Sequence, residues 1–371
     1  MPPPKWSKVA AKPSGGCVAF AASQPLSDTA ALICFGHRKG LSDEVWTFDP
    51  TCDDPWTLMH EPHQAVKPPL RTQSALAKLN NTDEKAAYFL LFGGFVQDVG
   101  EVNDTWKLRV PLDSTMNATP IQWQKLDCGD AQPDARYGHS LTNVKHYIVL
   151  FGGQNGNHQF NDLWAFDDAK SQWMEISVQT GVPPTPRTLH CAVEWSGKLL
   201  IIGGFSRSSG YLGDVHALSI SDEDNPKGDF QPVEIKLQEK GASWTARAQH
   251  CAATTGKSTN VFIFGGFDGT NVLNDLWMLN GSEFGAVNFT EIRLAGAPES
   301  RARSSCHILG SALCILGGFD GNKPVGTEVY HLNVEAPHTL VASSNDDAKG
   351  DAHVEENDAD QSAESEEIRD G

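Results

Sequence analysis

The chain has 371 residues, 39% of them apolar, which is enough for a sizeable hydrophobic core. It carries 47 acidic and 29 basic residues, a net charge of −18. This charge argues against non-specific nucleic-acid binding and against attachment to an anionic membrane, because both need a positive surface. The eight cysteines form no CxxC pair and no zinc-finger spacing, so we expect neither a disulfide scaffold nor a zinc module.

No stretch is apolar and long enough to cross a bilayer, and the first residues lack the apolar run of a secretory signal. A chain of this kind is expected in a reducing compartment, where thiols persist. We therefore expect a cytoplasmic protein without membrane insertion, with the nucleus as the open alternative.

One pattern recurs along the chain: a short apolar run that ends in two glycines. A degenerate copy, Phe35-Gly36-His37, has histidine in place of the second glycine. It is followed by full copies ending at Gly93-Gly94, Gly152-Gly153, Gly203-Gly204, Gly265-Gly266 and Gly317-Gly318. The first glycines of successive copies are 51 to 62 residues apart, and self-similarity at this period predicts a repeat architecture. Glycine pairs allow positive φ and close backbone approach where a strand turns sharply.

Each copy carries further elements in a fixed order. About ten residues after the glycines come an acidic residue and, two positions later, usually an aromatic one, as in Asp104-Thr105-Trp106. A second aromatic strand follows in most copies, for example at Trp123. Before each full copy an arginine opens another strand, and these arginines are Arg71, Arg136, Arg187, Arg247 and Arg303.

Four strands in about 50 residues are typical of one propeller blade. The order Arg-x-x-His, apolar run, Gly-Gly, Asp-x-Trp and Trp resembles the kelch repeat over roughly residues 4–333. The resemblance implies an all-β fold, a six-bladed β-propeller of kelch repeats. We divide the chain into this propeller at 1–336 and a disordered acidic tail at 337–371.

The last copy has only three strands, because the chain turns polar after Asn333. The missing strand is expected at the other end of the chain, where Trp6 leads a short segment that matches the fourth strand of the other copies. We predict that this N-terminal strand completes the last blade and closes the ring, which removes the open sheet edges. The resemblance supports this prediction, since kelch propellers close in this general way.

In an up-and-down blade, the start of the first strand and the end of the second lie on the same face. The five arginines should therefore share one mouth of the central channel with the loops after the glycine pairs, whose tips include Phe95, Phe205, Phe267 and Phe319. Two interpretations of the arginines are open. They tie loops to backbone carbonyls within each blade, or they form a ring that grips carboxylates. The resemblance favours the second for some positions, because rim arginines of several kelch modules contact acidic peptides.

Three histidines, His139, His190 and His250, also share one position in the repeat, and Cys191 and Cys251 follow two of them. A metal ring is conceivable, but the kelch pattern uses this histidine as a structural residue. We expect no metal, no cofactor and no catalytic residue, because no nucleophile elbow and no phosphate-binding loop is present.

From residue 343 onward the tail holds eleven acidic residues. The tail either keeps the protein soluble or competes with acidic partners for the arginine mouth. The leading hypothesis for function is a non-catalytic protein-interaction module, an adaptor, scaffold or effector, in a monomeric propeller that is not an enzyme. Its partner would be another protein or peptide, an acidic one if the arginines are accessible. The alternative is a metal-dependent enzyme or specifier protein that uses the channel mouth.

Overall fold

The computed structural model describes residues 4–9, 21–36, 41–59, 66–80, 83–112, 120–221, 224–239, 241–254, 259–281, 286–325, 328–335 and 340. Every named element in this part of the chain is a β-strand. Among these residues there is no helix whose length and hydropathy would let it cross a bilayer.

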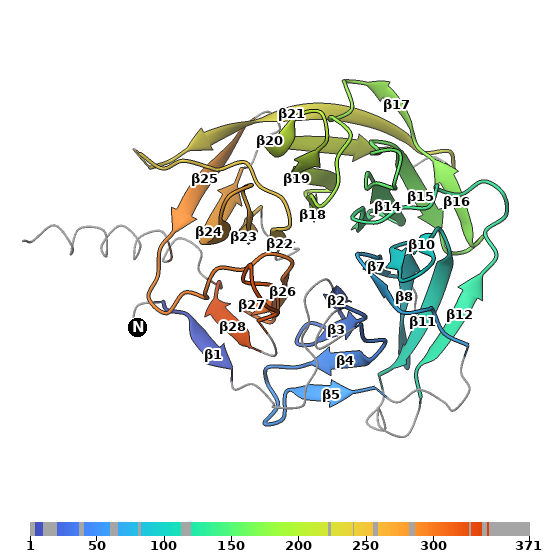
Figure 1. Cartoon of the computed structure of the whole chain (residues 1–371), viewed down its shortest axis with the longest axis horizontal. Coiled ribbons are helices and arrows are strands. Elements are labelled where there is room, and N and C mark those ends of the chain that lie inside the picture. The colour runs from blue at the N-terminus through green and yellow to red at the C-terminus, as the bar shows by residue number, and fades with distance from the viewer. Residues whose placement is uncertain are drawn as a thin grey trace, which may run out of the picture.

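Six four-stranded antiparallel meanders stand around a central axis and are numbered here as blades 1–6 in chain order (Figure 1). Blades 1 and 2 contain β2 (Ala22–Pro25), β3 (Ala31–Cys34), β4 (Val45–Phe48) and β5 (Trp56–Leu58), then β7 (Ala75–Lys78), β8 (Ala86–Phe92), β11 (Thr105–Pro111) and β12 (Gln122–Leu126). Blades 3 and 4 contain β13 (Ser140–Val144), β14 (Tyr147–Phe151), β15 (Leu163–Asp167) and β16 (Gln172–Glu175), then β18 (Cys191–Trp195), β19 (Lys198–Ser206), β20 (Gly210–Ile220) and β21 (Lys227–Leu237). Blades 5 and 6 contain β22 (Cys251–Thr254), β23 (Val261–Phe267), β24 (Val272–Asn280) and β25 (Ala286–Ile292), then β26 (Ser305–Leu309), β27 (Ala312–Leu316), β28 (Val329–Asn333) and β1 (Ser7–Val9).

Four short or shared pairings supplement the blades. A small sheet in the order β10 (Gly100–Glu101), β9 (Phe95–Val96) and β6 (Arg71–Thr72) lies beside blade 2. On the outer side, β21 pairs in parallel with both β25 and β17 (Ser177–Thr180), which joins blades 4 and 5 into one larger sheet.

The ring is closed by the N-terminal strand, as the sequence predicts. β1 pairs antiparallel with β28, with Lys8 opposite Tyr330. Trp6 precedes this strand and is only 5% exposed, and its backbone N–H donates to the carbonyl of Ala295. The first and last strands that the structure describes therefore share one sheet, and the all-β propeller fold is confirmed.

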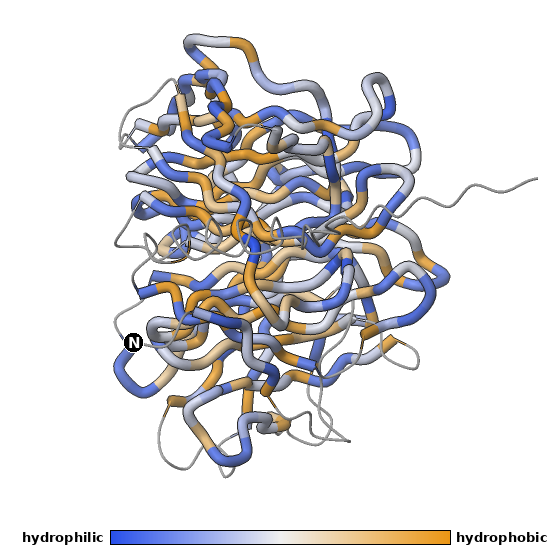
Figure 2. The backbone as a smooth tube through the Cα atoms, turned by 90° about the vertical axis from the view of Figure 1, so that its left-hand side faces the viewer, coloured by the Kyte–Doolittle hydropathy of each residue, from blue (hydrophilic) through white to orange (hydrophobic). Residues whose placement is uncertain are grey.

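The core of the molecule consists of six hydrophobic clusters, and each fills the seam between two adjacent blades. Tryptophans supply much of this surface: Trp106, Trp173 and Trp277 are at most 4% exposed. Figure 2 shows the apolar segments running through the interior of the ring and the hydrophilic residues mainly at its turns. Because a wedge between radial sheets widens outward, large flat rings fill it well.

The cluster between blades 5 and 6 corrects the predicted domain boundary. Leu340 belongs to this cluster and is fully buried, although it falls in the segment 337–371 that the sequence predicts as a disordered tail. The propeller core thus extends at least to Leu340. The acidic run that follows lies outside the described residues.

The glycine pairs adopt the positive φ values expected of them. In the blade 3 pair, φ is +64° at Gly152 and +94° at Gly153. A Cβ on Gly152 would lie 2.9 Å from the carbonyl oxygen of Arg187 and 3.1 Å from the ring of His190, both in the next blade. The first glycine of each pair therefore allows the following blade to approach closely.

Candidate functional site

Four of the five predicted arginines are structural ion pairs. Arg71, Arg136, Arg187 and Arg247 are fully buried. Each guanidinium forms a bidentate pair with the aspartate of its own repeat, with Nη1–Oδ1 distances of 2.6 to 2.7 Å and Nη2–Oδ2 distances of 2.7 to 2.9 Å. The pairs are Arg71–Asp104, Arg136–Asp162, Arg187–Asp214 and Arg247–Asp275. Bidentate pairs of this kind fix both charges in one geometry.

The remaining donors of these arginines bind backbone. In blade 3, Nη1 of Arg136 also donates to the carbonyl of Gly152 at 3.0 Å, and Nε donates to the carbonyl of Asp134 at 2.9 Å. The aspartate accepts a further hydrogen bond from the indole two positions later, at 2.9 Å from Trp164 to Asp162. One contact network thus joins the arginine, the glycine pair and the Asp-x-Trp motif in blades 2, 3 and 5, and in blade 4 His216 takes the place of the tryptophan.

The pKa values of these aspartates reflect the pairing. Burial alone would raise the pKa of Asp104, but the hydrogen bonds from Arg71 and Trp106 and the charge of Arg71 lower it below its usual value. The pKa of Asp214 is lowered against burial in the same way by Arg187 and His216. The hypothesis of five arginines open to carboxylates is therefore wrong for these four, whose carboxylate partners come from the chain itself.

In blade 6 the residue that corresponds to the four structural arginines is Arg301, not Arg303. Arg301 is fully buried, donates through Nη1 to the carbonyl of Gly317 at 3.2 Å, and lies over the ring of Tyr330 at 5.0 Å. In blade 6 the residue that corresponds to these aspartates is Glu328, which pairs with Lys8 of the closing strand. Two arginines two positions apart in the sequence made the register ambiguous.

Arg303 occupies the position two residues after the structural arginine, and this position forms a ring around the channel mouth. All five such residues have positive φ: Gln73, Gly138, Leu189, Gln249 and Arg303, with values of 55° to 66°. Their backbones are linked from blade to blade by N–H···O hydrogen bonds of 2.7 to 3.1 Å, in the order Gln73, Gly138, Leu189, Gln249, Arg303. Left-handed backbone is costly for residues other than glycine, and here the inter-blade hydrogen bonds hold it in place.

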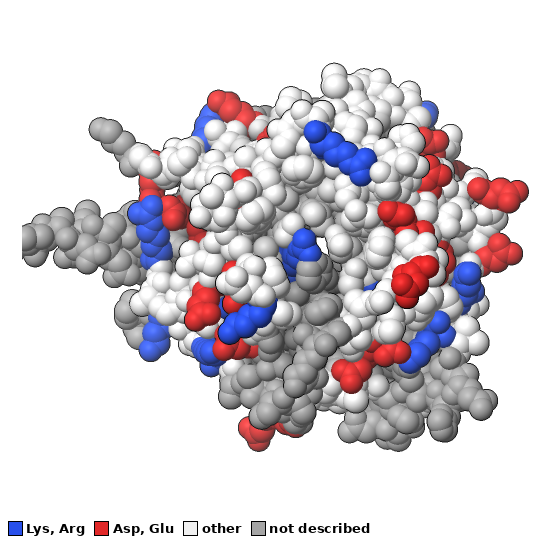
Figure 3. Space-filling view, in the orientation of Figure 1, with Lys and Arg blue, Asp and Glu red and all other residues white. Residues whose placement is uncertain are grey.

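This ring surrounds a small mouth pocket of about 160 Å³, lined by residues of all six blades. Arg303 is the one Lys or Arg among its described lining residues, and Figure 3 shows a basic side chain in the central hollow of this face. Nε of Arg303 donates to Oε1 of Gln249 at 2.7 Å. Burial lowers the pKa of Arg303 to about 10, which still leaves it charged at neutral pH.

The predicted phenylalanines do line the same face. Phe95, Phe205, Phe267 and Phe319 each pair, through an antiparallel bridge, with the residue that follows a structural arginine. Phe95 is 40% exposed, and the others are half-buried. Tyr211, which the sequence did not single out, lies between two of them, with ring centroids 5.2 Å from Phe205 and 5.6 Å from Phe267. Together these five side chains form an aromatic rim around the mouth.

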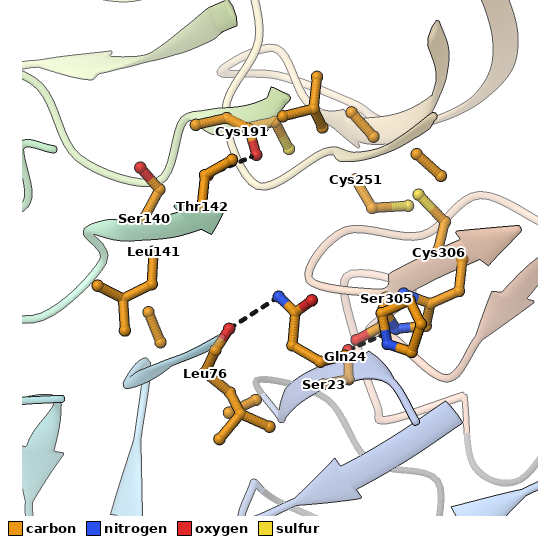
Figure 4. Close-up of a pocket in the computed structure, with 18 of the residues that line it drawn as sticks. Ser23, Gln24, Leu76, Ser140, Leu141, Thr142, Cys191, Cys251, Ser305 and Cys306 are labelled. Atoms are coloured by element: carbon orange, nitrogen blue, oxygen red, sulfur yellow. Dashed lines mark hydrogen bonds between the residues drawn. The ribbon is translucent and has the colours of Figure 1, made fainter. Parts of the chain in front are cut away.

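Below the mouth lies the central channel, a cavity of about 440 Å³ lined by the first strands of the blades (Figure 4). His190, His250 and His307 are buried along it, and His139 is buried beside the mouth pocket above it. Neither these four nor any other described residues form a group of three or more His, Cys, Asp or Glu that could hold a metal ion. His190 and His307 instead share hydrogen bonds of 2.9 Å with Ser140 and Ser23 of the neighbouring blade.

The arginine–aspartate pairs predict a difference between blades 3 and 6. We expect Asp162→Asn to lower the free energy of unfolding by about 2–4 kcal/mol, because the buried Arg136 loses its counter-ion; the partial exposure of Asp162 keeps the cost below the upper end for buried pairs. The matched control is Glu328→Gln, at the same register, which should cost about 0–1 kcal/mol because Glu328 pairs with a half-exposed lysine. Urea unfolding of both variants measures this, and equal losses would refute it.

Comparison with known proteins agrees with this architecture. The family described as the KLHDC2/KLHL20/DRC7 kelch-repeats domain matches residues 26–224. An F-box/kelch-repeat protein of Arabidopsis thaliana is 28% identical over 264 residues, 67% of this chain and 52% of that protein. Tip elongation aberrant protein 1 of Schizosaccharomyces pombe is 30% identical over 251 residues, 66% of this chain and 20% of that protein. Kelch domain-containing protein 10 of Xenopus laevis is 26% identical over 196 residues, 52% of this chain and 44% of that protein.

These matches span about half or less of each relative, so they bear on the propeller and not on the other parts of those proteins. The family match covers more than half of this chain and coincides with its repeated four-stranded blades. The chain therefore belongs to the kelch-repeat family.

Proposed function

We propose that the chain is a non-catalytic protein-interaction module that binds an acidic segment of a partner protein at the channel mouth. The observation that carries the proposal is the position of Arg303, a charged guanidinium that is partly removed from water inside a pocket built by all six blades. A carboxylate entering this pocket would meet a cation in surroundings of reduced dielectric, where ion pairing is stronger than at the open surface.

The aromatic rim supports the same proposal. Interfaces are enriched in aromatic and arginine anchors, and hot spots cluster where such residues surround a desolvated centre. Phe95 and Tyr211 offer apolar area at little cost in side-chain entropy, and the ring of inter-blade hydrogen bonds fixes the backbone beneath them. A segment with one carboxylate and flanking apolar residues fits this arrangement.

The test exchanges the mouth cation. Partners are captured from extract with the full chain, acidic peptides from them are synthesised, and their affinities are measured by fluorescence anisotropy. We expect Arg303→Gln to weaken binding about tenfold or more, since losing a charge-assisted contact costs about 1.5–3 kcal/mol. The matched control is Arg293→Gln, an exposed arginine just after β25 that pairs with Glu291, and it should bind as the wild type does. Equal affinities for Arg303→Gln and wild type would overturn the proposal.

A second arm of this experiment concerns the acidic tail. If the tail occupies the same pocket, a chain that ends after Ser344 should bind the peptides more tightly than the full chain at low salt. This end point retains Leu340, so the core between blades 5 and 6 stays intact. An unchanged affinity would assign the tail to solubility alone.

A further inference from the structure

Three cysteine side chains line the central channel on consecutive blades. Cys191 and Cys251 begin the first strands of blades 4 and 5, and Cys306 is the second residue of the first strand of blade 6. Cys191 is engaged by the backbone, because its thiol donates to the carbonyl of His250 at 2.7 Å. Burial raises the pKa of Cys191 well above its ordinary value, so this thiol is inert.

Cys251 and Cys306 differ from Cys191 because they face each other. Their strands β22 and β26 are neighbours around the channel, and both residues belong to the cluster that fills the seam between blades 5 and 6. Figure 4 shows the two sulfur atoms pointing toward one another at the channel wall. Each residue is 6% exposed, and the exposed surface faces the channel cavity, through which a small solute can arrive.

The surroundings of the two thiols are asymmetric. Burial alone would raise the pKa of Cys251, but the hydrogen bonds from the Cys306 thiol and from Ser304, whose hydroxyl oxygen is 3.5 Å from the Cys251 sulfur, lower it below its ordinary value. The charge of Arg301 acts in the same direction. Burial raises the pKa of Cys306, which therefore keeps its proton. A nucleophilic thiol beside a protonated one is the arrangement found in reactive dithiols.

We propose that Cys251 and Cys306 form a redox-active dithiol that is oxidised to a disulfide by a hydroperoxide entering through the channel. The Cys251 thiolate attacks the peroxide oxygen; an S–O bond forms, the O–O bond breaks, and the leaving hydroxide or alkoxide takes up a proton. The sulfur of Cys306 then attacks the resulting sulfenic acid, the S–S bond forms, and hydroxide leaves with the Cys306 proton as water. The two sulfurs lose two electrons in total, and the peroxide is reduced to water and an alcohol or to two waters.

The site is separate from the proposed partner-binding mouth and does not depend on it. The disulfide would join blades 5 and 6 across a seam that the N-terminal Trp6 also fills. A crosslink between positions 251 and 306 restricts the unfolded chain, so the oxidised protein should melt at a higher temperature than the reduced one.

The test uses the full chain. Reduced protein is treated with a small excess of hydrogen peroxide, free thiols are alkylated, and the digest is mapped without reductant. We expect the dominant product to be a crosslinked peptide pair containing Cys251 and Cys306, two hydrogens lighter than the sum of its parts and reversed by dithiothreitol. In Cys306→Ser this product should be lost, and Cys251 should instead be trapped by dimedone as the sulfenic acid.

Cys191→Ser is the matched control, since it removes a third thiol from the same wall and keeps both sulfurs that form the disulfide, and it should leave the crosslink yield unchanged. Two results would overturn the proposal: oxidation of Cys251 in the wild type without a bond to Cys306, or thiols at both positions that resist peroxide until denaturant is added. The peptide map of the wild-type protein alone decides whether the proposal holds, even if a variant folds poorly.

Discussion

A chain that lacks residues 1–9 is expected to melt far below the full-length protein. The deletion removes β1, exposes the edge of β28, and takes Trp6 out of the cluster between blades 5 and 6. The ring of Trp6 lies 6.2 Å from that of Phe264, so its loss also opens blade 5. Because a propeller is held together by closure of its ring, one open seam weakens every blade contact. Differential scanning calorimetry of the two chains measures the effect.

The variant Trp6→Ala separates the contribution of the Trp6 side chain to stability from that of strand β1. We expect it to lower the free energy of unfolding by about 3–5 kcal/mol, as for other large aromatic truncations in a core. Lys8→Ala is the matched control on the same strand; it removes a half-exposed ion pair with Glu328 and should cost no more than about 1 kcal/mol. A Trp6→Ala variant as stable as Lys8→Ala would show that the ring is not closed through this residue.

The blades and their closure could be predicted because their signals are local and repeated. A glycine pair after an apolar run identifies the same turn in every copy, and positive φ follows from residue type alone. The missing fourth strand of the last copy pointed to Trp6 at the other end of the chain, and the pairing of β1 with β28 confirms this. Where one copy of the pattern is incomplete, the other copies still show which element is expected there.

The candidate site was harder to predict because it depends on pairings between motifs. Arg136 and Asp162 were both recognised as repeated residues, yet nothing local shows that they bind each other across 26 positions. The sequence does contain a signal that could have revealed the pairing, since each of the four middle copies has one arginine and one aspartate at these two repeat positions. In blade 6, telling the structural arginine Arg301 from Arg303 required recognising the left-handed residue two positions after it. That residue is a glycine only in blade 3, at Gly138, so the sequence of the other blades does not reveal it.

The channel mouth is formed by hydrogen bonds between neighbouring blades, which the sequence of a single repeat does not show. Gln249 and Arg303 adopt left-handed backbone because hydrogen bonds from neighbouring blades hold them there, from Arg303 N–H to the carbonyl of Gln249 at 2.7 Å and from Gln249 N–H to that of Leu189 at 2.8 Å. Such a ring exists only once the blades are assembled. The ring places Arg303, which has no role in the repeat pattern, in the mouth pocket as its cation.

Lowering the pH from 7 to 5 is expected to cost the protein several kcal/mol of stability. Burial, aided by nearby arginines, lowers the pKa of His139 and His250 to about 3, and burial lowers that of His307 to about 4 and that of His190 well below its ordinary value. In the unfolded chain all four take up a proton below about pH 6.5. The unfolded state thus binds more protons than the folded one as the pH falls, and each histidine removes up to about 1.4 kcal/mol per pH unit.

Urea unfolding at several pH values between 7 and 5 measures this slope. His139→Gln should reduce it by about a quarter, since one of four titrating groups is lost, whereas His158→Gln exchanges an exposed histidine and is the matched control. The arginine-paired aspartates act in a different window. The folded-state pKa values of Asp104 and Asp214 are lowered, so their contribution is complete above about pH 4 and is lost only below it. A stability that stays flat down to pH 5 and falls only below pH 4 would therefore mean that the aspartates alone set the acid limit, and that the histidines are not held neutral between the blades.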